Sequence, residues 1–209
     1  MAVKTRQTHF IVEGAHEFET TFKAIEGTEK VTIAGDKAVV AYLADDSAQS
    51  GWYFDENDQG TFLNLDSRCR GAISRKAAQE ALKANPDRAF VINKYEHGQV
   101  RYYRQINHEV SATIPDQQWD VSHGCAVYIA PDDVPNPGAY CDSVMEEFTN
   151  WCNGEVYGVC SAVYTKSGDT WIEETSDECW GFIGGDNARL ERDARHKDIF
   201  EEVTTKETT

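Results

Sequence analysis

The segment Ser122–Cys125 places a histidine two positions before a cysteine, and His108 precedes it. A cysteine becomes a strong nucleophile when a neighbouring histidine lowers its pKa and raises the thiolate fraction at neutral pH. The pattern therefore suggests a transferase or hydrolase that uses Cys125 with His108 or His123. The alternative interpretation is a turn that enters a strand, with Cys125 as a small core residue.

The same residues could bind a metal, because the chain has six cysteines and six histidines. No Cys-x-x-Cys or His-x-x-x-His spacing occurs, and His123 with Cys125 supplies too few ligands for zinc. A zinc site completed by His108 and a distant cysteine stays open as an alternative. Our expectation is that no metal or cofactor is bound and that Cys141, Cys152 and Cys179 are core residues.

Acidic residues dominate the second half of the chain. The whole sequence has 36 Asp and Glu against 20 Lys and Arg, a net charge of −16. Residues 131–202 contain 17 acidic and 5 basic residues, a net of −12. Such charge most often forms a solvated face, but it could also bind a basic partner. The candidate interaction residues are the densest pairs: Glu146, Glu147, Glu173, Glu174, Asp177 and Glu178.

The charge also excludes some functions. A strongly negative surface repels nucleic acid and anionic lipid, so neither direct nucleic-acid binding nor membrane binding is expected. No apolar run is long enough to span a membrane, and none follows the N-terminus. We therefore expect a cytoplasmic protein with reduced cysteines. Acidity that serves solubility alone, or a halophilic source, would explain the charge without a partner.

Hydrophobic periodicity and turn residues predict an α+β fold, with a largely antiparallel sheet and two or three helices. Residues 1–200 are expected to form a single globular domain with an acidic second half at 131–202, and residues 201–209 a disordered tail. The expected helices are 74–84, 139–152 and 186–200. The expected strands are Phe10–Val12, Lys30–Ala34, Ala38–Leu43, Gly51–Phe54, Thr61–Leu63, Ala89–Asn93, Gln99–Arg104, Cys125–Ala130, Glu155–Tyr164 and Thr170–Glu174.

Three segments between about residues 100 and 190 resemble an uncharacterised family of small, acidic bacteriophage proteins. That family has a Trp-Asp-Ser strand entry, a helix closing in Asn-Gly-Asp-Val-Tyr-Gly, and a terminal Ser-Cys-Trp-Gly-Phe-Tyr-Gly. Val121 and Ile183 depart from its pattern. The matching residues are Trp119, Asp120, Asn153, Gly154, Tyr157, Gly158, Cys179, Trp180, Gly181 and Phe182.

The resemblance implies a phage or prophage origin and an accessory role, since the family offers no activity to carry over. The motif residues themselves have a structural interpretation. Trp119, Tyr157 and Trp180 are expected to be core aromatics. The motif glycines are expected to serve turns or close backbone packing.

Ser122–Cys125 also resembles the Ser-His-Gly-Cys signature of L,D-transpeptidases, which have an earlier histidine at about the distance of His108. Those enzymes continue with an apolar residue and then Arg or Asn, whereas Ala126–Tyr128 follows here. They also act outside the membrane, and this chain has no recognisable export signal.

The leading hypothesis is a phage accessory protein, located in the cytoplasm of an infected bacterium, that binds a host or viral macromolecule. The expected partner is a protein with a basic surface, such as a nucleic-acid-binding or defence protein that the acidic surface would inhibit. Two alternatives stay open. One is a cysteine enzyme built on Cys125, and the other is a structural or assembly component of the virion.

Overall fold

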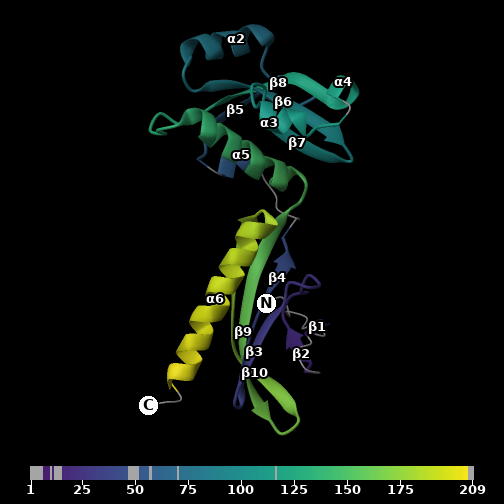
Figure 1. Ribbon diagram of the computed structural model, residues 1–209, viewed down its shortest axis with the longest axis vertical. Coiled ribbons are helices and arrows are strands. Elements are labelled where there is room, and N and C mark those ends of the chain that lie inside the picture. Colours follow the sequence, from purple (N-terminus) through teal and green to yellow (C-terminus); the bar gives the residue numbers. More distant parts are fainter. Residues whose placement is uncertain are drawn as a thin grey trace. The chain divides into compact units, whose positions relative to one another are not determined.

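The computed structural model describes residues 7–9, 11, 16–46, 52–56, 58–69, 71–115 and 117–206 (Figure 1). Contacts between residues group the chain into two compact units. Unit 1 combines residues 1–49 with residues 154–209, and unit 2 is residues 50–153, inserted between them. Among the described residues, no helix is both long enough and apolar enough to cross a membrane.

Unit 1 is a four-stranded antiparallel sheet with a long helix, α6, along one face (Figure 1). The strand order is β10-β9-β4-β3, so β10 and β3 are the edges. A short antiparallel pair, β1 with β2, belongs to the same unit. The elements are β1 (Gln7–His9), β2 (Phe18–Thr20), β3 (Lys30–Ala34), β4 (Lys37–Asp45), β9 (Val156–Ser167), β10 (Thr170–Ile183) and α6 (Gly185–Lys206).

Both faces of the central strands β4 and β9 are buried, which explains why these strands read as almost continuous apolar runs. On one face, alternate residues such as Tyr42 and Tyr164 pack with Phe18 of β2. On the other face, Leu43 and Val159 pack with Ala188 of α6. Each fully buried large apolar side chain contributes roughly 1.5–3 kcal/mol, so covering both faces is the main stabilising term of this unit.

Two hairpins of unit 1 turn on the same dipeptide. Gly35 and Asp36 separate the paired residues Ala34 and Lys37, while Gly168–Asp169 separates the paired residues at the ends of β9 and β10. Gly35 and Gly168 have φ values of 59° and 64°. Only glycine adopts this left-handed region without steric cost, so the sequence fixes both turns locally.

The middle of α6 meets the sheet through polar side chains. Arg192 donates to the carbonyl of Thr28 at 2.6 Å. His196 is 4% exposed, and its Nε2 has no hydrogen-bond partner. Its ring forms a hydrogen bond with the backbone of Val39 on β4. Helix α6 is therefore held by the packing of Ala188 in its first turn and by polar contacts at its centre.

Unit 2 is a second four-stranded antiparallel sheet, with strand order β5-β8-β6-β7. The helix α5 packs against it, in contact with β7 (Figure 1). Its elements are α1 (Tyr53–Glu56), β5 (Thr61–Asn64), α2 (Arg75–Ala84), β6 (Ala89–His97), β7 (Gln99–Arg104), α3 (His108–Ala112), α4 (Gln117–Asp120), β8 (Val121–Ile129) and α5 (Pro137–Cys152).

Helix α5 is defined at both ends by asparagine. The side chain of Asn136 accepts from the amide of Ala139 at the N-terminus. Asn153, just after the last turn, accepts from the amide of Val100 and donates to its carbonyl, at 2.9 and 2.8 Å. Phe148, fully buried on the inner face, packs against aromatic rings of α1, β5 and β7. The helix is thus tied to the edge strand β7 while its aromatic face forms the core.

The expected α+β class is confirmed, with an antiparallel arrangement in both sheets. The helices at 74–84 and 139–152 and the hairpins around residues 35, 98 and 168 are where the sequence predicts them. Within the described residues, three helices have ten or more residues, and α1, α3 and α4 are single turns. That the chain folds as one cooperative domain stays a prediction.

Three expectations differ from the structure. Tyr53 begins a helical turn where a strand was expected, because the ring is buried among Phe54, Phe148 and Trp151. Strand β10 continues to Ile183 rather than ending at Glu174. Helix α6 continues to Lys206, beyond the expected end, and residues 207–209 of the expected tail lie outside the described residues, as do Phe10 and Val12.

Burial of His196 makes the stability of unit 1 dependent on pH. Burial lowers the pKa of His196, and the positive charges of Lys30 and Arg192 act in the same direction, against Asp193 and the Val39 backbone. The pKa of His196 is therefore lower in the folded protein than in the unfolded chain, so the unfolded chain binds a proton more readily. As the pH falls below about 6.5, the usual histidine pKa, the free energy of unfolding should lose this contribution.

We expect the His196→Gln variant to lack this decrease in the free energy of unfolding at acidic pH. The measurement is urea unfolding of both proteins on either side of the usual histidine pKa, where acidification should reduce the advantage of the wild type over the variant. His123→Gln, at an exposed position, controls for loss of a surface histidine. An equal pH dependence of the wild type and His196→Gln would contradict the assignment.

Candidate functional site

The structure divides the six candidate carboxylates among three places. Glu146 and Glu147 lie on α5 of unit 2, and the other four lie on β10 of unit 1. We call these four, Glu173, Glu174, Asp177 and Glu178, the β10 carboxylates. They share one strand but two faces of the sheet, so the six residues predicted as one surface belong to two separate units.

The register of β10 against β9 determines which face of the sheet each carboxylate lies on. Asp177 is opposite Ser161, and both lie on the face that α6 covers. Glu178 is opposite Cys160, which belongs to the core of the other face. A register shift between Glu173 and Thr175 leaves Glu174 as the extra residue, which turns it toward α6.

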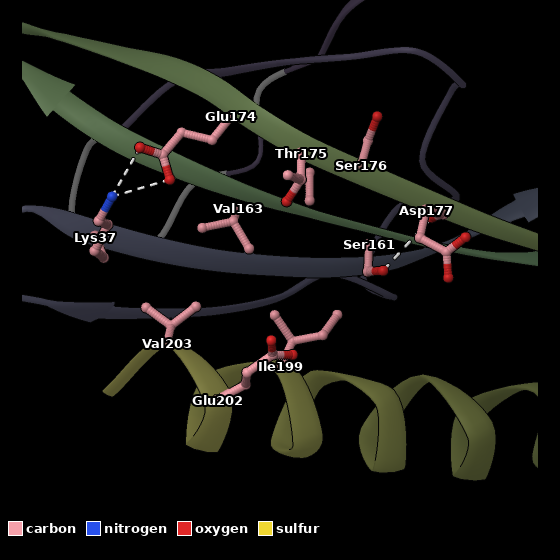
Figure 2. Close-up of a pocket in the computed structure, with 11 residues that line it drawn as sticks. Lys37, Ser161, Val163, Glu174, Thr175, Ser176, Asp177, Ile199, Glu202 and Val203 are labelled. Carbon is pink, nitrogen blue, oxygen red and sulfur yellow. Dashed lines mark hydrogen bonds and ion pairs between the residues drawn. The ribbon is translucent and has the colours of Figure 1, made fainter. Parts of the chain in front are cut away.

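The two carboxylates on the α6 face each bind a cation of the same unit. Lys37 of β4 donates to both oxygens of Glu174 at 2.8 and 2.9 Å (Figure 2). Arg195 of α6 donates to Asp177 at 2.6 Å. The hydrogen bond from Lys37 lowers the pKa of Glu174, so this carboxylate stays charged in mild acid. The side chains of Glu174 and Asp177 are still 44% and 73% exposed.

Strand β10 is an acidic edge. Within the described residues only β9 pairs with it, and its outer edge carries no other strand. Its 14 residues include four carboxylates and no lysine or arginine. Charged side chains on an edge strand keep a second sheet from pairing with it, so the acidity has a structural use that needs no partner.

Six of the basic residues of unit 1 form ion pairs within the unit. The chain segments of this unit hold 21 acidic and 11 basic residues, a net of −10, against −6 for unit 2. In the described part of the unit, the six basic residues in these ion pairs are held by neighbouring carboxylates, which makes them less available to phosphate. The paired residues are Lys30, Lys37, Arg189, Arg192, Arg195 and Lys197.

The two α5 carboxylates differ from each other. Glu147 is half-buried and accepts hydrogen bonds from Tyr53 at 2.9 Å and from Gln59 at 3.1 Å. Burial and the charge of Glu147 raise the pKa of Tyr53 well above its usual range. Glu146 is exposed. Glu147 therefore has a structural role in unit 2, and Glu146 is the more exposed of the two.

The environment of Cys125 does not favour a thiolate. Burial raises the pKa of Cys125 to about 12, with Lys94 opposing and Asp66 reinforcing the shift. His108 begins α3 and His123 lies on β8, and both are exposed. A thiol in this state is protonated at neutral pH and is a poor nucleophile. In the part of the chain that the structure describes, no three His, Cys, Asp or Glu residues are grouped to hold a metal.

Most of the motif residues in unit 1 have packing roles. Trp180 lies directly over Gly158, where a Cβ would overlap the Cε3 and Cζ3 atoms of the ring. Phe182 and Tyr157 are opposite each other and pack against the core under α6. Gly181, with φ of 89°, lies in the register shift between Cys179 and Phe182. These glycines and aromatics behave as the structural interpretation expects.

The other motif residues include one correction. Trp119 was expected in the core but is 80% exposed, because the short helix α4 presents it to solvent. Asp120 beside it binds Nδ1 of His97 at 2.9 Å. Asn153 ends α5 as described, and Gly154 follows with φ of 75°. The motif segments are thus split between the two units.

Sequence reasoning missed the residues of α6 and β4 that share the α6 face with Glu174 and Asp177. These include Lys37, Arg195 and Glu202, which come from segments far apart in the chain. A signal existed in α6, where Arg192, Arg195 and Ile199 recur at helical spacing, but basic residues at an inner position do not match the usual apolar pattern.

Comparisons with protein-family models, with curated proteins and with solved structures found no match. The site is therefore interpreted from its own residues and geometry. The resemblance to phage proteins stays a prediction from the motifs.

The thiols should react according to their burial. Iodoacetamide near neutral pH should label Cys69, which is exposed, much faster than Cys125. Burial also raises the pKa of Cys141, Cys152 and Cys160 to about 12, so these should resist labelling as well. Mass spectrometry of peptides gives the rates, and labelling in denaturant shows that each thiol is otherwise reactive. Fast labelling of Cys125 in the native protein would restore the enzyme hypothesis.

The contact between Gly158 and Trp180 can be tested by stability. Gly158→Ala should lower the free energy of unfolding by about 1–3 kcal/mol, because the Trp180 ring is packed against Phe22 and cannot move freely. Gly185→Ala is the control, since its nearest neighbour is the flexible end of Arg189 at 3.3 Å.

The double variant Gly158→Ala/Trp180→Leu identifies the cause. It should be less destabilised than the sum of its single variants, because leucine leaves room for the new methyl group. Additive losses would show that the ring is not what Gly158 accommodates.

Proposed function

We propose that this protein acts by binding a basic protein through the β10 carboxylates of unit 1. The observation that carries the proposal is an edge strand on which residues 174–178 are exposed and, together with the half-buried Glu173, hold four carboxylates and no cation. Fields of one sign attract and orient a partner of opposite charge, and they raise the association rate. They also repel nucleic acid, which fits an inhibitor that occupies the phosphate-binding surface of another protein.

The resemblance to phage proteins indicates where this binding would take place. A phage accessory protein in the cytoplasm of an infected bacterium would meet host nucleic-acid-binding and defence proteins, whose working surfaces are rich in Lys and Arg. The proposed role is to bind and block such a surface. The split of charge between the units, −10 against −6, supports unit 1 as the binding part.

Charge reversal tests the proposal. Tagged protein is used to capture partners from a nuclease-treated bacterial lysate, and retained proteins are identified by mass spectrometry. The variant Glu173→Lys/Glu178→Lys should lose a partner that the wild type retains, because two attractive contacts become repulsive. The variant leaves intact the ion pairs of Glu174 with Lys37 and of Asp177 with Arg195, and circular dichroism verifies its fold.

The matched control makes the same change of charge in unit 2. Asp133→Lys/Glu146→Lys alters two exposed carboxylates there and should retain the partner. Equal loss from both variants would indicate a general effect of net charge. A partner retained by the β10 variant would contradict the proposal, and the same protein found in purified particles would favour the virion alternative.

A further inference from the structure

A groove lies between the C-terminal half of α6 and strands β9 and β10 (Figure 2). Its volume is about 470 Å³. Val163 points from β9 toward α6, and Ile199 and Val203 point from α6 toward the sheet (Figure 2). We call this cleft the α6 groove. Its polar lining comes from Lys37, Ser161, Glu174, Thr175, Ser176, Asp177 and Glu202.

The groove exists because this part of the helix–sheet interface is underfilled. Three of the sheet residues that face α6 here are small: Ser161, Val163 and Thr175. Closely packed helix–sheet interfaces leave no such space, and here the small side chains leave a groove that is open to solvent. Its volume falls in the range of known ligand pockets, roughly 300–1,000 Å³.

The chemistry of the lining selects for cations with apolar stems. Three carboxylates and one ammonium surround an apolar floor. Two of the carboxylates already hold cations of this chain, Glu174 with Lys37 and Asp177 with Arg195. A carboxylate can accept from several donors at once, so these interactions leave acceptor capacity for a further cation. Arginine and lysine combine an apolar stem with a charged tip and match both parts of the groove.

We propose that the α6 groove receives a basic residue and its apolar neighbour from an extended segment of the partner protein. The inference rests on the proposed function and specifies which part of unit 1 makes the central contact. A peptide is favoured over a free amine because residues 174–177 of the groove lining belong to β10, which within the described residues is an edge strand, and an edge strand can bind an extended segment. Alternate side chains of that segment would then point into the groove.

A labelled octapeptide of alternating arginine and leucine serves as the probe, and fluorescence anisotropy measures its affinity for the full chain. Thr175→Trp fills the groove from its rim and should weaken binding by about tenfold, as loss of one central anchor does. Ile172→Trp is the control, because Ile172 is exposed on the same strand but does not line the groove.

A second pair of variants keeps the test independent of that substitution. Glu202→Lys reverses a charge of the lining and should also weaken the probe by about tenfold, whereas Asp198→Lys, exposed one turn earlier on α6, should change its affinity less than about twofold. Circular dichroism of all four variants verifies the fold. A probe with glycine in place of leucine should bind more weakly than the original, because the apolar floor loses its contact.

Three results would overturn the inference: no saturable binding of the probe, equal effects of groove and control variants, or equal affinity for the glycine probe. None of these affects the wider proposal if the captured partner still depends on Glu173 and Glu178, which lie outside the groove lining. Failure of both the groove variants and the Glu173→Lys/Glu178→Lys variant to alter binding would end both proposals.

Discussion

The pairing of β4 with β9 is the constraint on which unit 1 depends. It joins residues 37–45 to residues 157–165 in antiparallel register, across the whole of unit 2. Closing so long a loop costs little more than closing a moderate one, because the entropy of closure grows only with the logarithm of length. The apolar residues on both strands repay that cost only if both faces are covered. The N-terminal strands cover one face, and α6 covers the other.

Helix α6 covers its face of the sheet mainly through polar contacts. Ala188 supplies apolar packing at the start of the helix, while Arg192, Arg195 and His196 meet the sheet further along. Polar contacts hold the helix at defined points, but they do not fill the space between small side chains of β9 and β10. The result is one face of the sheet with a buried, neutral histidine at its centre and an acidic groove toward the C-terminal end. The polar side chains of α6 thus both hold the helix on the sheet and leave the groove beside it.

The sequence predicted what short-range chemistry decides. Glycine–aspartate turns, the asparagine that ends α5 and the apolar stripe of that helix are local signals, and they appear where expected. The pairing of β4 with β9 was not predictable, because no local signal links strands so far apart. The burial of Cys125 and the exposure of Trp119 likewise depend on neighbours that only the fold supplies. The acidic residues were recognised, but their division between two units and two faces required the register of β10.

The central claim is that carboxylates on β10 attract a basic protein. The most direct measurement is the affinity of the captured partner for the full chain as the salt concentration is raised, by calorimetry or anisotropy. Opposite charges at a partly exposed interface are screened within a Debye length of about 10 Å at 0.1 M salt, so the account predicts a steep loss of affinity between low and high salt. The Glu173→Lys/Glu178→Lys variant should show both a lower affinity and a shallower dependence on salt. An affinity that is unchanged by salt and equal in the wild type and the variant would contradict the account.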